Sequence, residues 1–380
     1  MPSVFNLSFD LQVPRYTGVA LSEFWFNLIL MNLIFVLVYI YRRKRYPMYI
    51  TWTSFLFFCL FAFWDTDYFS FANTFYNGLD DFRDIIYKYF SYISFGSYIL
   101  FRLYIWGIAT LLVYKTSLRF GLNTNIMCFV FTLFFMLTFS YARASLGMAF
   151  FFYGLSFLIV PKGNVINRFL TIAFSFFLAY CSHRSLAVLV GLSPLSLITL
   201  SKRKAILLLL SFPIIIVVIK IVFSGIAAGY LGNDNEFAAA AQGYSSNSVE
   251  LQFNWKWRII TTLRYYSLYL ANVVLIWYFI FKENVKIPIG ISRLLTFTTL
   301  IVLMSIAILS IPSGINLGLW VIGYRYLYMT GIPFCILLAF SRQNGIIPNN
   351  AYRFLLIMAV LYGELFIIGK IITLQYGFTG

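Results

Sequence analysis

Long continuous apolar runs constrain this sequence more than any other feature. Runs such as 21–41, 205–223 and 354–374 contain few charges and are about as long as a helix that crosses a bilayer. Strands of a membrane barrel would alternate polar and apolar residues, whereas these runs are apolar throughout. The sequence therefore predicts an all-α integral membrane protein with about twelve transmembrane helices.

The individual spans are predicted from where each apolar run begins and ends. They cover residues 21–41, 50–64, 96–114, 123–139, 146–160, 169–181, 186–200, 205–223, 258–281, 294–311, 319–340 and 354–374. Because 61% of the residues are hydrophobic and no segment is predicted to form a soluble domain, we expect residues 1–380 to form one polytopic membrane domain.

Basic residues mark one set of connections between the spans. Arg42–Arg45 and Lys202–Lys204 occupy short tips, and the positive-inside rule places such tips in the cytoplasm. The formal net charge of +16 therefore reflects orientation in a membrane and not binding to nucleic acid. The four cysteines lie within or beside apolar runs and lack the spacing of metal ligands.

Two longer polar segments, 65–95 and 224–257, are predicted on the extracytoplasmic side, and they hold most of the acidic residues. The first interleaves charges with aromatic and aliphatic residues, which is typical of an amphipathic helix lying on a membrane. The second is rich in Gly, Ala, Ser and Asn and is predicted to be a loop.

The only histidine, His183, is followed by Arg184 at the tip between runs 169–181 and 186–200. Such a pair faces water or lipid headgroups at a membrane surface. One interpretation is a tight hairpin tip with polar side chains that reach the interface. The other is a site that acts on a lipid-linked substrate.

Six arginines break the positive-inside pattern, since they fall at or just below the predicted outer face. They are Arg102, Arg143, Arg184, Arg258, Arg264 and Arg325. An arginine within a span is costly and needs a partner. The extracytoplasmic carboxylates could supply one, but six arginines from different spans favour a shared anionic ligand, since guanidinium groups match phosphate oxygens.

Glu364 is a further charge near the middle of a predicted span. We expect it to pair with a buried arginine, although an intramembrane acid can also relay protons in a transporter.

Four short motifs resemble those of the EpsG/Wzy-like bacterial polysaccharide polymerases. Arg143–Ala149 is similar to their Arg-Gln-small-hydrophobic-Ala motif, with Ala144 and Gly147 as departures, and His183–Ala187 resembles their His-x-Ser-Ala motif. Arg325–Pro333 resembles a late Arg-hydrophobic-x-Tyr segment, and Asp65–Tyr68 matches the position of an early Asp-Tyr motif. Together these motifs cover most of the chain.

The resemblance implies a GT-C-like glycosyltransferase that joins undecaprenyl-pyrophosphate-linked oligosaccharide units in O-antigen assembly. The active site would face the outside of the bacterial inner membrane. The six arginines would bind the pyrophosphate, and Asp65, Asp67 or His183 would accept the proton of the acceptor hydroxyl. We expect no cofactor and no metal. Besides the substrate, the expected partners are membrane lipids and a chain-length regulator.

Two other functions remain open. A flippase for lipid-linked saccharides would need polar residues along its whole path, whereas the unusual charges here gather in the outer half. An O-antigen ligase shares the chemistry but usually carries a larger external domain than residues 224–257 provide.

Overall fold

The computed structural model describes residues 21–40, 49, 74–76, 85–134, 142–227, 255–281, 287–309 and 317–376. All the elements in these ranges are helices, as the sequence predicts, and no strand occurs among them. The predicted span 50–64 and most of the two longer extracytoplasmic segments lie outside the described residues.

The helices follow the apolar runs. They are α1 (Leu21–Ile40), α4 (Ile85–Ile93), α5 (Tyr98–Arg119), α6 (Thr124–Phe134), α7 (Ala142–Ile159), α8 (Val165–Ser182), α9 (Leu186–Leu192), the 3₁₀ helix η4 (Ser193–Leu197), α10 (Lys202–Leu210), α11 (Phe212–Ala227), α13 (Trp255–Phe281), α14 (Ile289–Leu309), α15 (Leu317–Met329), α16 (Gly331–Gln343) and α17 (Asn349–Tyr376). Polar residues cap the helices that start between runs. Ser97 and Asn164, for example, accept hydrogen bonds from backbone N–H groups of α5 and α8.

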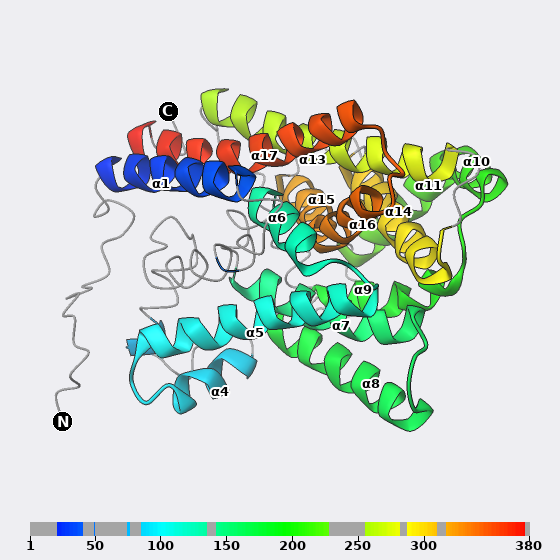
Figure 1. Cartoon of the computed structure of the whole chain (residues 1–380), viewed down its shortest axis with the longest axis horizontal. Coiled ribbons are helices and arrows are strands. Elements are labelled where there is room, and N and C mark those ends of the chain that lie inside the picture. The colour runs from blue at the N-terminus through cyan, green and yellow to red at the C-terminus, as the bar shows by residue number, and fades with distance from the viewer. Residues whose placement is uncertain are drawn as a thin grey trace.

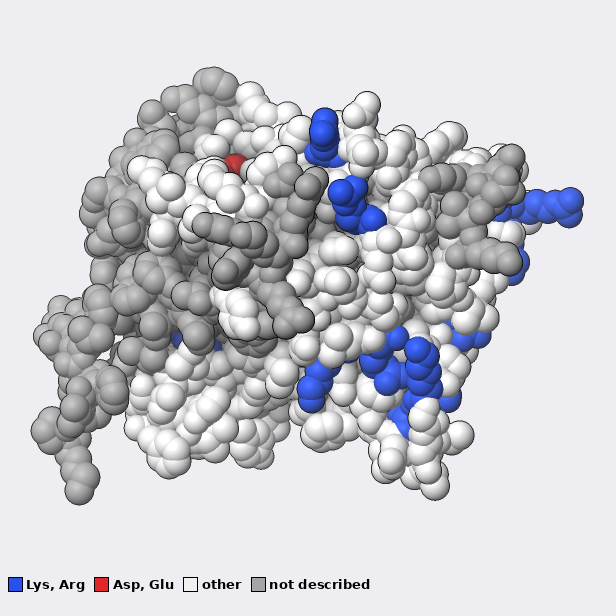
Figure 2. Space-filling view, viewed as in Figure 1, with Lys and Arg blue, Asp and Glu red and all other residues white. Residues whose placement is uncertain are grey.

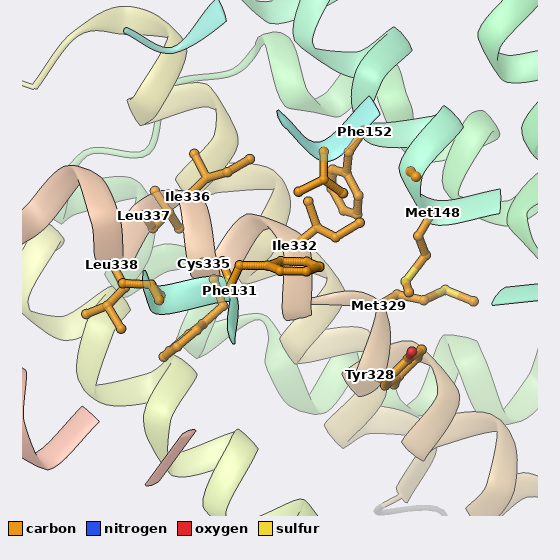
Figure 3. Packing of buried hydrophobic residues seen from close by; sticks show 14 of the residues in the cluster. Phe131, Met148, Phe152, Tyr328, Met329, Ile332, Cys335, Ile336, Leu337 and Leu338 are labelled. Carbon is orange, nitrogen blue, oxygen red and sulfur yellow. The ribbon is translucent and has the colours of Figure 1, made fainter. Parts of the chain in front are cut away.

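The helices form a bundle of three layers. α1, α13 and α17 run along one side, and α4, α5, α7 and α8 run along the other (Figure 1). α6, α14, α15 and α16 lie between them, and every residue of α16 from Gly331 to Ser341 is buried. The core is therefore built around α14 and α16, where apolar side chains such as Phe131, Phe152 and Ile332 pack together (Figure 3).

Basic residues gather at one end of this bundle, which we call the basic end. Arg119 at the end of α5 donates to the Val160 carbonyl, and Arg293 at the start of α14 donates to the Ile159 carbonyl. Gln343 of α16 donates to the Gly121 carbonyl. On the face shown in Figure 2, the Lys and Arg side chains lie mostly in the right-hand half, where α10 lies and α8 begins.

Within the described ranges, three helical segments are long and apolar enough to cross a membrane: α8, the part of α13 from Ile259 to Phe281, and α14. α14 is mostly buried, whereas α8 exposes large apolar side chains, including Phe169, Phe174 and Phe177. Water is a poor solvent for such a face, and lipid is a good one. The fold is therefore that of a membrane protein, although the structure does not reproduce twelve uninterrupted spans.

Three predicted spans are interrupted, which corrects the prediction of one continuous helix in each. Run 186–200 forms α9 and η4, run 205–223 divides between α10 and α11, and run 319–340 divides between α15 and α16. Each break lies at or near a proline: Pro194, Pro213 and Pro333. Proline has no N–H for the helical ladder and its ring clashes with the preceding turn, so an apolar run that contains one need not be a single helix.

The first longer segment contains the predicted amphipathic helix, α4. Its Ile86 and Tyr87 are buried, whereas Tyr89 and Tyr92 are exposed. α4 packs against α5 and α8 and does not lie apart from the bundle, because Tyr87 and Phe90 contact aromatic rings of α5. It therefore adds a short helix to the side of the bundle.

Candidate functional site

The start of α7 lies at the end of the bundle opposite the basic end. α5 and α7 end together at the Arg119–Val160 hydrogen bond, so their N-terminal turns lie together at the opposite end. α8 runs antiparallel to α7, which brings the tip between α8 and α9 to the same place. α13 ends beside Lys202, at the basic end, and therefore begins at the opposite end. The helices thus carry all six unusual arginines and His183 into the half of the bundle away from the basic end.

Gly147 lets the α8–α9 tip approach α7 closely. A Cβ atom at this position would lie 2.4 Å from Leu186 Cδ1 and 3.3 Å from His183 Cβ. The Ala179 carbonyl oxygen would also lie 3.3 Å away. The segment from Ala179 to Leu186 therefore rests on the backbone of α7, one turn after Arg143, and glycine at position 147 makes this contact possible.

The tip itself is a tight turn. The N–H of His183 donates to the Ala179 carbonyl, and the N–H of Leu186 donates to the His183 carbonyl. His183 is half-buried and Arg184 is exposed. Between Arg184 and Leu186, the buried hydroxyl of Ser185 has no hydrogen-bond partner among the described residues. A ligand at the tip would therefore find the exposed guanidinium of Arg184, next in the chain to a buried hydroxyl.

A second contact joins the start of α7 to α15. The hydroxyls of Ser145 and Tyr328 lie 3.0 Å apart in a buried hydrogen bond. Met148, three residues after Ser145 on α7, and Met329, next to Tyr328 on α15, belong to the same buried cluster (Figure 3). Tyr328 follows Arg325 by one helical turn. The segments that begin at Arg143, His183 and Arg325 therefore meet around the first turns of α7.

Neither a protein-family model nor a curated protein or solved structure matches the chain. The resemblance to polysaccharide polymerases therefore rests on the sequence motifs.

Two of the six arginines are enclosed by aromatic rings. Arg264 is 7% exposed, and its guanidinium carbon lies 4.9 Å from the ring centre of Tyr362 and 4.3 Å from that of Phe366. Its Nη2 donates to the Tyr362 hydroxyl at 3.4 Å. Arg102 is 2% exposed and lies 6.0 Å from the ring centre of Trp106. Both guanidinium groups gain from the negative faces of aromatic rings, and neither is open to a ligand in this arrangement.

The other predicted site residues divide into two sets. Arg184 and Arg325 are exposed and therefore accessible to a ligand. Arg143 and Arg258 lie in the first turns of α7 and α13, and their side chains are outside the described part of the structure. Asp65 and Asp67 also lie outside the described residues, so the structure places no carboxylate of this pair.

A stacked tyrosine pair connects the neighbours of two arginines. Tyr265, next to Arg264 on α13, stacks on Tyr324, next to Arg325 on α15, with ring centres 3.6 Å apart. Arg264 and Arg325 therefore belong to one local arrangement, with Arg264 behind the aromatic layer and Arg325 exposed.

Sequence reasoning missed a buried polar contact at the break between α15 and α16. Asn272 of α13 is fully buried, and its side-chain amide donates to Thr330 Oγ1 at 3.0 Å and to the Leu268 carbonyl at 2.9 Å. Pro333 cannot donate to the Met329 carbonyl, which loosens the helix there. The signals in the sequence were an asparagine within a span and the sequence Gly331-Ile-Pro333.

No group of His, Cys, Asp and Glu side chains that could hold a metal ion occurs within the described ranges.

Proposed function

We propose that this protein is a membrane glycosyltransferase of the polysaccharide-polymerase type. The observation that carries the proposal is the meeting of three motif segments at the first turns of α7. Gly147 contacts the tip that holds His183, and Ser145 bonds to Tyr328, one turn from Arg325. These segments are far apart in the sequence, and a shared substrate is a physical reason for them to meet.

The proposed substrates are two undecaprenyl-pyrophosphate-linked oligosaccharides. The hydroxyl oxygen of one attacks the anomeric carbon of the other, and the bond from that carbon to the pyrophosphate oxygen breaks. The hydroxyl proton passes to a base, and the lipid pyrophosphate leaves with the electron pair of the broken bond. The protein must therefore stabilise charge on the leaving pyrophosphate and accept one proton.

The exposure of the arginines suggests different tasks for them. Arg184 and Arg325 are exposed and are the proposed ligands of the pyrophosphate. Arg264 and Arg102 are enclosed by rings, and we propose that they support the site from behind. Arg143 and Arg258 are proposed as further ligands from their positions in the first turns of their helices. Asp65, Asp67 and His183 are the candidate bases.

The proposed location is the bacterial inner membrane, with the basic end in the cytoplasm and the first turns of α7 on the outer side. The warrant is the positive-inside rule applied to the basic end. Lipid-linked units would enter from the membrane, to which α8 exposes its apolar side chains.

Complementation tests this function directly. The gene is expressed in a strain that lacks its own polymerase, and the surface polysaccharide is separated on a gel. A ladder of polymer lengths supports the proposal. If no polymerase-deficient strain yields a ladder, the purified protein is incubated with lipid-linked repeat units, with and without EDTA. Lack of polymer from every repeat unit, with the protein folded, would reject the proposal.

Transport of lipid-linked saccharides is a second candidate, because one observation favours it. Many transporters bind substrate where a helix is broken near the middle of the membrane. Here run 319–340 is broken between α15 and α16, beside the buried Asn272–Thr330 contact. Movement of fluorescent lipid-linked saccharide across vesicles, without polymer formation, would favour this function over the first.

A further inference from the structure

Glu364 lies in the middle of α17 and has surroundings that the sequence did not predict. It is the only acidic residue whose side chain the structure describes, and it is half-buried. The expected partner was a buried arginine. However, the nearby Arg264 contacts Tyr362 and Phe366, and two residues along a helix turn the side chain by about 200° to the other side. Glu364 therefore faces α1, away from Arg264.

The described partner of Glu364 is an amide. Its carboxyl group forms a hydrogen bond with the side chain of Asn32 on α1. The other carboxyl oxygen, Oε1, is shielded from solvent and has no hydrogen-bond partner in the described structure. The polar pair lies among exposed apolar side chains, such as Ile29 and Val36 on α1 and Leu361 on α17. On the face shown in Figure 2, the described side chains beside the acidic atoms are uncharged.

Among the side chains that the structure describes, the helices that pack on α17 bring no cation to this pair. α6 has no charged residue, and the only charged residue of α1 is Glu23, near its start. Charged residues of α13 are Lys256 and Arg258 in its first turn and Arg264, which faces the other side of α17. Within α17, Arg353 lies about three turns before Glu364, and Lys370 lies six residues after it, with its Cβ direction turned by about 120° from that of Glu364.

A carboxylate in such a place would keep a full charge beside apolar groups, with one oxygen unsatisfied. A neutral carboxylic acid fits better, because it has one donor and one acceptor, and the amide of Asn32 offers both in return. We propose that Glu364 and Asn32 form a proton-binding site between α1 and α17, open to the lipid side of the bundle. This inference does not depend on the proposed function.

A hydrophobic carbodiimide tests the site, because it dissolves in lipid and reacts with neutral carboxylic acids. The acid O–H adds across one C=N bond to give an O-acylisourea, which rearranges to a stable N-acylurea with every atom retained. Tryptic cleavage after Arg353 and Lys370 releases a peptide in which Glu364 has the only side-chain carboxyl. Mass spectrometry of this peptide therefore reports on one residue.

The whole protein in lipid nanodiscs is treated with dicyclohexylcarbodiimide at acidic, neutral and alkaline pH. We expect the peptide to be modified at neutral pH, modification to fall at alkaline pH, and a water-soluble carbodiimide to leave it unmodified. The E364Q variant should lose the modification. An unmodified peptide at acidic pH, or equal modification by the water-soluble reagent, would overturn the proposal. Because the native chain is mapped, neither result depends on the folding of a variant.

Discussion

The close approach at Gly147 makes a sharp prediction about the α8–α9 tip. In Gly147→Ala, the new methyl group would lie 2.4 Å from Leu186 Cδ1, well inside the usual contact distance between carbon atoms. Leu186 is fully buried, so its side chain has little room to turn. The tip that carries His183 must therefore move away from α7, by about 1 Å if the contact is to become normal.

The expected change in stability is small compared with the expected change in activity. An extra methyl group in a packed interface costs about 1–3 kcal/mol, and alanine in place of glycine within a helix returns about 1 kcal/mol. A shift of about 1 Å in a group that positions substrate can lower the rate roughly a hundredfold. We therefore expect Gly147→Ala to stay folded in the membrane and to lose most polymer formation.

Gly154→Ala is the matched control. Gly154 lies two turns further along α7 in the same contact with α8, where a Cβ atom would lie 2.9 Å from Ser175 Cβ. Both variants overpack the same helix pair, but only the first lies beside the tip. Rates with purified protein and lipid-linked units, measured together with thermal unfolding, separate the two effects. Gly154→Ala should unfold at a similar temperature to Gly147→Ala and keep its activity.

A second substitution tests whether the contact with Leu186 causes the loss of activity in Gly147→Ala. Leu186→Ala removes the Cδ1 atom, so the double variant Gly147→Ala with Leu186→Ala should recover part of the activity that Gly147→Ala alone loses. Equal loss of activity in Gly147→Ala and Gly154→Ala, or full activity in Gly147→Ala, would refute the reasoning that places the tip in the site.

Three further predictions concern the site and its orientation. Arg325→Ala should abolish the polysaccharide ladder while the protein remains in the membrane, and Arg325→Lys should restore little of it, because an ammonium group cannot form two parallel hydrogen bonds to a phosphate. Loss of protein from the membrane would instead indicate that Arg325 stabilises the fold. In a cysteine-free background, a cysteine at position 183 should react with an impermeant reagent from outside, and one at 203 only after permeabilisation, so labelling of position 203 from outside would reject the orientation. Asp65→Asn or Asp67→Asn should reduce turnover more than His183→Gln, with and without EDTA; full turnover in both Asn variants and none in His183→Gln would assign the base to the histidine.

Much of the fold follows from the apolar runs, because the length of a run predicts the length of the helical segment that is shielded from water. The first span is predicted over 21–41 and α1 covers Leu21–Ile40, and run 146–160 begins four residues after the start of α7 and ends one residue after its end. A run does not report continuity, however. Thr330 interrupts run 319–340 because its N–H and hydroxyl both donate to the Leu327 carbonyl and because Pro333 donates nothing to the preceding turn.

The candidate site was harder to predict, since residues that lie at one end of a bundle need not touch. The asymmetry of charge placed the arginines at one end, but it carried no information on the Ser145–Tyr328 hydrogen bond or on the burial of Arg264. Gly147 was noted only as a departure from a motif. Its importance depends on the distance to the α8–α9 tip, and a single sequence does not contain that distance.

Two arginines that donate hydrogen bonds to carbonyls at the end of α7 have a consequence for how the chain is inserted into the membrane. Arg119 and Arg293 belong to different helices, and their hydrogen bonds at 2.7 Å and 3.2 Å occupy the carbonyls of Val160 and Ile159. If α14 entered the membrane upside down, Arg293 would lie at the wrong surface and a carbonyl would lose its donor. Only the correct orientation of α14 thus allows this packing contact to form during biogenesis. A misinserted helix would lack the hydrogen bond and would be open to reorientation or degradation.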